Sequence, residues 1–223
     1  MAKKYDADLH VFHLTTEKEM ELFTEGDVIG KKITAEVCVH HMHFEESSYA
    51  ELGNQIKCNP SIKYESDRQA LIQALLNNKI DIIATDHAPH TWDEKMMKYQ
   101  EAPAGLPLVQ HGLQILMDFY HQGILSLETI AEKTSHNVAK RFQVKDRGYI
   151  REGCFADIVI VDIDKKYEVT NDNILYKCAW SPFLGKTFNS SIYMTICNGH
   201  VAFQDGQLNN CLLYTSPSPR DAL

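Results

Sequence analysis

The sequence has no apolar run long enough to cross a bilayer and no Cys-x-x-Cys pair. Residues 1–10, MAKKYDADLH, lack the apolar core of a secretory signal, so we expect a cytoplasmic protein without a membrane partner. The six cysteines stand singly, most of them within apolar stretches. Reduced, buried thiols are the expectation for such residues in a cytosolic protein.

Positive charge is also scarce, because 22 Lys and Arg stand against 30 Asp and Glu, for a formal net charge of -8. No basic stripe is visible, which argues against a nucleic-acid partner. No internal repeat is evident either. The 223 residues therefore predict one large domain, or a domain and a half, with an ordinary packed core.

An alternation of strand and helix patterns is present between residues 9 and 142. Short apolar, β-rich runs predict buried strands at 9–14, 32–40 and 80–85. Helix patterns occupy 16–26 with a Thr16–Glu19 capping box, 65–79, 105–123, and 126–142 as two short helices capped by Ser126 and Ser135. This order is typical of βα units around a parallel sheet and predicts an α/β fold class.

The pattern changes after Gly148. Short alternating runs, broken by turn dipeptides such as Asn198-Gly199 and Asp205-Gly206, predict a small antiparallel β module. We therefore divide the chain into an α/β part at 1–147 and a β module at 148–208. The last stretch, 209–223, contains SPSP and no periodicity, and we expect it to be a disordered, non-native tail.

Polar residues gather at the ends of the predicted strands, where parallel α/β barrels have their active sites. Asp86 ends the strand at 80–85, and His90 follows after a proline-directed turn. A bare carboxylate in a cavity above the sheet would be costly, and a divalent metal would keep it ionised. The alternative is an Asp that caps the next loop, with His87 and His90 hydrogen-bonded on the surface.

Other histidines are weaker candidates. His10 and His13 are three residues apart and point to opposite faces of an ideal strand, so His13, at the strand end, is the better candidate to face the mouth. A satisfied core or surface histidine is the alternative there. His41 and His43 form a His-x-His pair, but the pair falls past its strand into a loop, which argues against a ligand role.

Two loops have residues suited to ligand contact. Asn59 offers a donor and an acceptor, although a turn Asn before Pro60 is the simpler explanation. The small-residue loop that contains Ala104 and Gly105 opens a helix, and its backbone N–H groups could hold an anion.

Seven motifs follow one another along the chain: LHVFHLTT, AEVCVHH, KCNPSIKYESDRQAL, ATDHAPHTWDEK, AGLPL, SHNVAKRF and GYIREGCFADIVIVD. In this order they resemble the C-terminal portion of class I type dihydroorotases of the amidohydrolase superfamily. DHAPHTWDEK is the most specific motif, and the resemblance covers residues 2–207. It implies strands six to eight of a TIM-like (β/α)8 metal-dependent hydrolase barrel at 1–147, plus a small β-sandwich module at 148–208.

The resemblance also implies roles by position. His13 would bind the second of two Zn²⁺ ions, and Asp86 would bind the first and shuttle a proton. Asn59 and His90 would bind the substrate together with the backbone of Ala104 and Gly105. The implied reaction is the reversible interconversion of N-carbamoyl-L-aspartate and (S)-dihydroorotate in pyrimidine biosynthesis, by metal-assisted hydrolysis of a ring amide.

The family's His-x-His metal pair, its bridging carboxylated Lys or Asp and its substrate-gripping Arg have no match here. We therefore expect a truncated fragment that is poorly stable and inactive alone, with residues 9–14 as an unpaired apolar edge. A homodimer is left open. The alternatives are a non-catalytic dihydroorotase-like scaffold, which would tend to lose residues such as His13, Asp86 and His90, and a hydantoinase or allantoinase, which usually lacks APH after the strand-end Asp.

Overall fold

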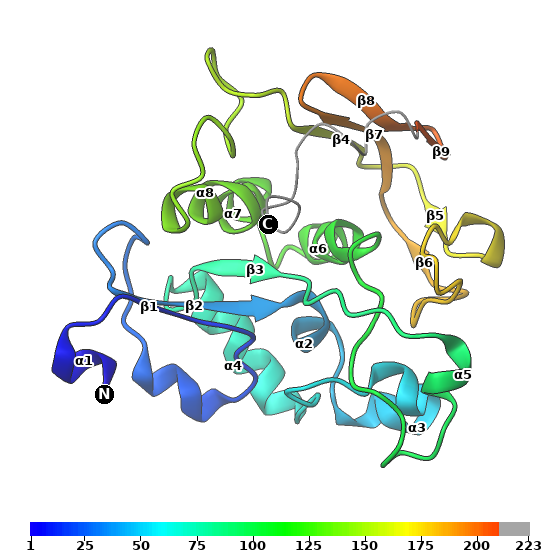
Figure 1. Cartoon of the computed structure of the whole chain (residues 1–223), viewed down its shortest axis with the longest axis horizontal. Coiled ribbons are helices and arrows are strands. Elements are labelled where there is room, and N and C mark those ends of the chain that lie inside the picture. The colour runs from blue at the N-terminus through cyan, green and yellow to red at the C-terminus, as the bar shows by residue number, and fades with distance from the viewer. Residues whose placement is uncertain (210–223) are drawn as a thin grey trace, which may run out of the picture.

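The computed structural model describes residues 1–209 (Figure 1). From residue 210 on, the tail predicted at 209–223 lies outside the described residues. Within the described part, no helix is both long and apolar enough to cross a membrane.

A three-stranded parallel sheet occupies the first half of the chain. Its strands are β1 Leu9–Val11, β2 Ile33–Cys38 and β3 Ile82–Ala84, in the order β1-β2-β3. Each strand lies within a range predicted from the sequence, so the strand positions are confirmed. β1 is an edge strand, and the exposed side chains of Leu9 and Phe12 bear out its apolar character.

The two faces of this sheet differ in chemistry because side chains alternate along a strand. On β2, Ala35 and Val37 are fully buried in the main hydrophobic core. Thr34, Glu36 and Cys38 point to the opposite face. The polar face is therefore the one that can present functional groups.

Helices complete the core on the apolar face. α4 Glu65–Leu76 buries Leu71 and Leu75, and α6 Gly112–His121 buries Ile115, in the same cluster as Ala35 and Val37. The shorter helical segments are α1 Ala2–Tyr5, η1 Glu17–Leu22, α2 Val39–His43, η2 Glu46–Ser48, α3 Tyr49–Leu52, η3 Gly53–Ile56, α5 Trp92–Lys95, α7 Leu127–Ala131, η4 Glu132–His136, α8 Asn137–Arg141 and η5 Asn171–Asn173.

The predicted helix caps are confirmed in two places and wrong in a third. The Glu19 carboxylate accepts hydrogen bonds from the Thr16 N–H (2.8 Å) and hydroxyl (2.9 Å) at the start of η1. The Ser126 hydroxyl accepts from the Thr129 N–H at 3.1 Å and caps α7. Ser135 caps nothing, because it lies inside π-helical η4, which joins α7 directly to α8.

The helix predicted at 105–123 begins later than expected. α6 starts at Gly112, and residues before it form an extended loop that pairs with the chain after β3 through His87 and Leu106. The His87 Nδ1 accepts from the N–H groups of Leu108 (3.0 Å) and Val109 (3.3 Å). These bonds use donors that the first turn of a longer helix would have left unpaired.

The second half of the chain forms antiparallel sheets. β4 Ile158–Asp162, β7 Ser191–Cys197, β8 His200–Gln204 and β9 Gln207–Leu208 make one sheet, and β5 Tyr167–Glu168 pairs with β6 Thr187–Phe188. Asn198-Gly199 joins β7 to β8 and Asp205-Gly206 joins β8 to β9, all four residues with positive φ. Both turns are the two-residue hairpin turns that the sequence predicted.

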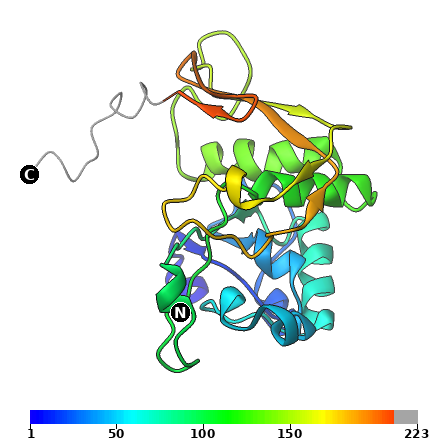
Figure 2. The same ribbon diagram turned by 90° about the vertical axis from the view of Figure 1, so that its right-hand side faces the viewer.

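Helices α6, α7 and α8 lie between the parallel sheet and the four-stranded antiparallel sheet (Figures 1 and 2). Part of the region after residue 148 packs into the main core, since Val169, Phe183 and Phe188 belong to the same hydrophobic cluster as residues of α4 and α6. A domain boundary at 147/148 stays a prediction.

The cysteines differ from expectation. Cys38 and Cys58 are buried, but Cys154 and Cys178 are partly exposed and Cys197 is exposed on β7. The prediction of generally buried thiols is wrong for these three, because their short strands and loops have one face open to solvent.

Candidate functional site

His13 and Asp86 leave their strands in the same way. Each follows the carboxyl end of a strand, β1 or β3, and each has a positive φ, 39° and 47° respectively. Just after His13 the chain returns to β2, where the Leu14 N–H donates to the Glu36 carbonyl at 2.9 Å. Since the carboxyl ends of parallel strands share one edge of a sheet, both residues lie at that edge.

Between them is a buried group that we call the Cys38 cluster, made of Cys38, His40 and His41. One ligand atom from each lies within 4.8 Å of the other two, and all three residues are buried. Cys38 ends β2 and the two histidines belong to α2, which starts at the next residue. The direct passage from strand to helix folds these side chains together.

The pKa values of the Cys38 cluster are affected by both predicted metal ligands, His13 and Asp86. Burial holds the pKa of His40 well below its ordinary value and lowers that of His41 to about 4, with His13 adding to both effects. Burial also raises the pKa of the Cys38 thiol, and the Asp86 carboxylate adds to it. His13 and Asp86 are thus both close enough to this cluster to influence its titration. That the two side chains face one common mouth stays a prediction.

The Asn59 loop borders the same cluster through Cys58. The Cys58 Sγ lies 3.9 Å from the His41 Nε2. Burial raises the pKa of this thiol to about 12, with a further contribution from Asp86. Asn59 itself is exposed, next to Cys58.

His90, Ala104 and Gly105 are brought together by direct contacts. The His90 Nε2 donates to the Ala104 carbonyl at 3.1 Å. A Cβ on Gly105 would lie 3.1 Å from the same nitrogen. The Gly105 N–H donates to the Lys57 carbonyl at 2.9 Å, which joins this loop to the Asn59 loop.

Lys95 ties these loops together from a fully buried position. Its ammonium donates to the carbonyl oxygens of Lys57 (3.1 Å), Pro103 (3.0 Å) and Gly105 (2.9 Å). Burial lowers the pKa of this amine to about 8. Lys95 is the last residue of DHAPHTWDEK, and α5 is started by a Thr91–Glu94 capping box.

The region after residue 148 also reaches the site. The Trp180 indole N–H donates to the His90 carbonyl at 2.7 Å. This bond fixes the backbone of His90 from a segment 90 residues away in sequence.

The chain matches the amidohydrolase family over residues 2–202. It belongs to that family. Among curated proteins, it is 33% identical over 208 residues to a dihydroorotase of Macrococcus caseolyticus, covering 93% of this chain and 49% of that protein. It is 35% identical over 206 residues to a dihydroorotase of Clostridium acetobutylicum, covering 92% and 48%. The chain thus spans about half the length of the curated relatives it matches, and the resemblance to part of a dihydroorotase is confirmed.

Solved structures confirm the fold of this amidohydrolase chain. An L-hydantoinase (dihydropyrimidinase) from Arthrobacter aurescens matches with a TM-score of 0.83 at 22% identity, covering 93% of this chain and 47% of that one. A D-hydantoinase (dihydropyrimidinase) from Thermus sp. matches with a TM-score of 0.82 at 20% identity and the same coverage. The fold is therefore part of a TIM-barrel-like amidohydrolase, as predicted.

Three expectations about the amidohydrolase site are corrected. Asp86 is exposed, so the predicted burial of its carboxylate is wrong here; no strand pairs with the far side of β3 among the described residues. His41 and His43 lie in helix α2 and not in a loop. The His87 ring accepts hydrogen bonds from the loop before α6, which is a structural role. This agrees only in part with the alternative that His87 is simply hydrogen-bonded on the surface.

His13 and Asp86 fit a zinc ion by donor type, since imidazole nitrogen and carboxylate oxygen are ordinary zinc ligands. His10, the other histidine of that motif, is already satisfied by the Thr34 hydroxyl (2.8 Å) and the Glu36 carboxylate (3.0 Å). The choice of His13 over His10 as the ligand candidate is consistent with these contacts.

Sequence reasoning missed Lys95, His40 and Cys38. Lys95 stands in the most specific motif, and a lysine at a fixed place beside a substrate loop was the available signal. Cys38 had no such signal, and His40 had only its place at the end of a predicted strand, because their proximity depends on how α2 turns away from β2.

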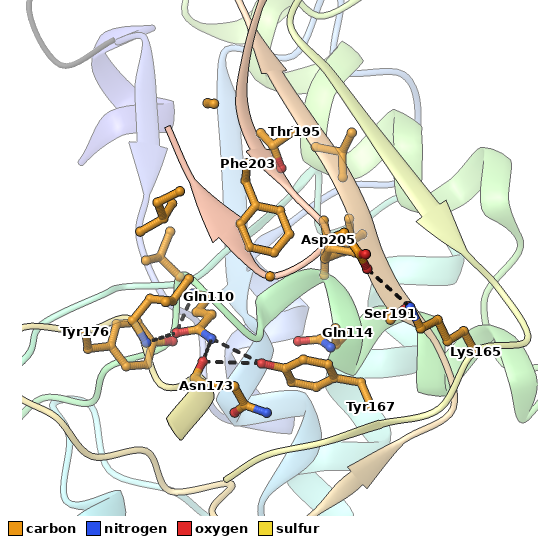
Figure 3. A pocket seen from close by; sticks show the side chains of 18 of the residues that line it. Gln110, Gln114, Lys165, Tyr167, Asn173, Tyr176, Ser191, Thr195, Phe203 and Asp205 are labelled. Carbon is orange, nitrogen blue, oxygen red and sulfur yellow. Dashed lines mark hydrogen bonds and ion pairs between the residues drawn. The ribbon is translucent and has the colours of Figure 1, made fainter. Parts of the chain in front are cut away.

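A separate cavity of about 690 Å³ lies between α6 and the antiparallel strands (Figure 3). Gln110 joins its walls, donating from Nε2 to the Asn173 carbonyl (2.7 Å) and accepting from the Leu175 N–H (2.8 Å). None of the predicted site residues lines this cavity, so it has no part in the function proposed below.

Proposed function

We propose that this chain supplies the His13 and Asp86 metal ligands and the substrate loops of a cyclic amide hydrolase that interconverts dihydroorotate and N-carbamoyl-L-aspartate. One observation supports it most. His13 and Asp86 follow β1 and β3 at the carboxyl edge of the sheet, on either side of the strand that ends at Cys38. Cys58 next to Asn59 lies 3.9 Å from His41, and Lys95 joins the Asn59 loop to the Gly105 loop. The 33–35% identity to dihydroorotases gives the substrate class.

In the hydrolytic direction, water adds to the ring amide carbon of dihydroorotate and the ring C–N bond breaks. Asp86 would accept a proton from the attacking water and deliver it to the leaving nitrogen. One water is consumed, and its second proton is released when the new carboxylic acid ionises. Bound zinc would polarise the carbonyl and lower the pKa of the water, with His13 and Asp86 among its ligands.

Substrate orientation would come from the two loops. The His90 Nε2 is occupied by Ala104, so a protonated ring would donate through Nδ1 to the substrate carboxylate. The Gly105 N–H is donated to Lys57, whereas no hydrogen bond is formed by the Ala104 N–H among residues 1–209. Ala104 therefore offers the free backbone donor of this loop, Gly105 permits its close approach to Ala88, and Asn59 adds an exposed amide.

The chain alone would be inactive, because further metal ligands and the substrate Arg of the family have no match in it. The test is expression of the longest reading frame that contains it, assayed with dihydroorotate, hydantoin and allantoin. Asp86→Asn should lower kcat at least about 100-fold. Asp93→Asn, an exposed carboxylate on α5, is the matched control and should leave kcat unchanged.

Preferential turnover of hydantoin or allantoin would overturn the substrate. Full activity of Asp86→Asn would overturn the proton shuttle. A folded full-length protein with neither zinc nor turnover would favour the non-catalytic scaffold. Ordinary turnover by the 223-residue chain itself would refute its proposed inactivity.

A further inference from the structure

The Cys38 cluster is unusual because ring nitrogens in it are buried without hydrogen bonds of normal geometry. Neither ring nitrogen of His40 forms a hydrogen bond of normal geometry within residues 1–209, although the Thr85 backbone makes a weaker contact with this ring. The Nδ1 of His41 has no hydrogen-bond partner there either. His40 is fully buried and His41 is 3% exposed. Buried polar groups normally have a partner, so each such atom needs an explanation.

The tautomer of His41 leaves the buried Nδ1 with a lone pair that no hydrogen bond within residues 1–209 uses. Its Nε2–H donates to the Pro60 carbonyl at 2.9 Å. Nδ1 therefore carries no proton in the neutral ring. A histidine that donates one N–H to a backbone carbonyl and leaves the other nitrogen unprotonated has the arrangement found in metal-binding histidines.

The geometry is close to that of a bound ion. The two imidazole centroids of His40 and His41 are 4.0 Å apart, with the rings tilted by 42°, and no hydrogen bond joins them. One ligand atom of Cys38 lies within 4.8 Å of theirs. Tetrahedral zinc with sulfur at about 2.3 Å and nitrogen at about 2.0 Å sets its ligand atoms roughly 3.5 Å apart, so small side-chain movements would suffice.

We propose that Cys38, His40 and His41 bind a transition-metal ion of the zinc class, at a site separate from the one that uses His13 and Asp86. One sulfur and two nitrogens suit Zn²⁺ and exclude Mg²⁺ and Ca²⁺, which need oxygen ligands. Binding replaces the thiol proton with a sulfur–metal bond and releases one proton to solvent per ion. The proposal is independent of the hydrolase function.

Cys58 is not a ligand of this ion. Its Sγ donates to the Pro60 carbonyl at 3.1 Å. It also lies beside the His41 Nε2, the nitrogen that carries the proton. Cys58 is therefore a matched control, because it is a second buried thiol next to the same histidine.

The test uses Co²⁺ as the probe, added to the chelator-treated 223-residue chain. A sulfur-to-cobalt charge-transfer band in the near ultraviolet should appear and saturate at one equivalent. Cys38→Ser should abolish the band and weaken Co²⁺ binding at this site at least about tenfold. Cys58→Ser and His13→Ala should both retain the band, with folding checked by circular dichroism.

Absence of the band in folded wild-type chain would overturn the proposal. So would its survival in Cys38→Ser, or its loss in Cys58→Ser or His13→Ala. If Cys38→Ser does not fold, X-ray absorption on the zinc-loaded wild type decides. One sulfur at about 2.3 Å with two imidazole nitrogens at about 2.0 Å supports the site, and a shell of nitrogen and oxygen only would refute it. None of these readouts depends on hydrolase activity.

Discussion

The ammonium group of Lys95 donates a hydrogen bond of 2.9 Å to the carbonyl oxygen of Gly105. Its two other bonds reach Pro103 in the same loop and Lys57 in the Asn59 loop. A single fully buried cation thus holds two substrate loops, one at Lys57 and one at Pro103 and Gly105, that are more than 40 residues apart in sequence. The positions of the two loops with the proposed substrate contacts therefore depend on Lys95, which has no proposed contact with the substrate itself.

Lys95→Met should destabilise the chain by about 3 kcal/mol, because three buried carbonyl oxygens lose their donor while the aliphatic stem is kept. Hydrogen exchange at the Gly105 amide, which donates to Lys57, should also accelerate. Urea unfolding and exchange monitored by mass spectrometry measure the two effects. Lys98→Met, an exposed lysine of the same segment, should change neither by a comparable amount. Equal effects of the two substitutions would contradict the role of Lys95.

Gly105→Ala should cost about 3 kcal/mol. The added Cβ would lie 2.5 Å from the Ala88 carbonyl oxygen and 2.8 Å from the Ala88 Cβ, and the φ of 140° is unfavourable for any L side chain. The matched control is Gly123→Ala, where φ is 70° and no atom lies within 4 Å of the new Cβ. That change should cost about 1 kcal/mol, from the left-handed backbone alone. The difference between the two losses in unfolding free energy then reports the close contacts at Gly105 together with the difference in backbone strain between the two sites.

Local sequence patterns were sufficient to predict most strands and turns of the fold. The strands at 9–14, 32–40 and 80–85 and the turns at Asn198 and Asp205 follow from alternation and turn chemistry, which act over a few residues. The start of α6 does not, because His87 captures the N–H groups of Leu108 and Val109 from more than 20 residues away. The helix propensity of residues 105–123 cannot reveal that partner, because His87 lies outside the segment.

The candidate site divides in the same way. His13 and Asp86 could be named because strand ends are visible in sequence and the motifs matched a family. The exposure of Asp86 could not, because it depends on which strands lie beside β3. The Cys38 cluster was hidden for a geometric reason, since α2 follows β2 without a loop. His40 was predicted to end the strand and His41 to lie in a loop, whereas both are buried residues of α2.

A buried ion pair lies at the amino ends of β2 and β3, opposite the edge with the candidate site. The Lys31 ammonium lies 2.8 Å from the Asp81 carboxylate, whose second oxygen accepts from the Ala35 N–H at 3.0 Å. Asp81→Ala should therefore destabilise the chain by about 3–5 kcal/mol, because it leaves a nearly buried ammonium without its partner. The comparison is Lys165→Ala, which breaks the exposed Lys165–Asp205 pair without changing the β8–β9 turn and should cost less than about 1 kcal/mol. Similar losses from both substitutions in thermal unfolding would refute the distinction.

Part of the acid sensitivity should arise from His111, which is fully buried at the start of α6. The pKa values of His40, His41 and His43 are also lowered by burial, so these histidines should contribute as well. Burial lowers the pKa of His111 from 6.5 to about 4. Between these values the unfolded chain binds more protons than the folded one, so stability rises with pH across this window and is lost as pH falls through it. The loss from this residue should approach about 3 kcal/mol by pH 4.

The measurement is the free energy of urea unfolding at pH 7, 5.5 and 4 for wild type and His111→Gln. The variant starts from a lower stability at pH 7, because the Ser181 hydroxyl loses its 3.2 Å contact with the ring. It should nevertheless lose less stability than wild type on acidification, since it no longer has a buried imidazole whose pKa is lowered by folding. His200→Gln, at an exposed position on β8, controls for the substitution and should follow the wild-type pH curve. An unchanged acid loss in His111→Gln would show that the proton is taken up elsewhere and that the buried ring at 111 is not the group that opposes it.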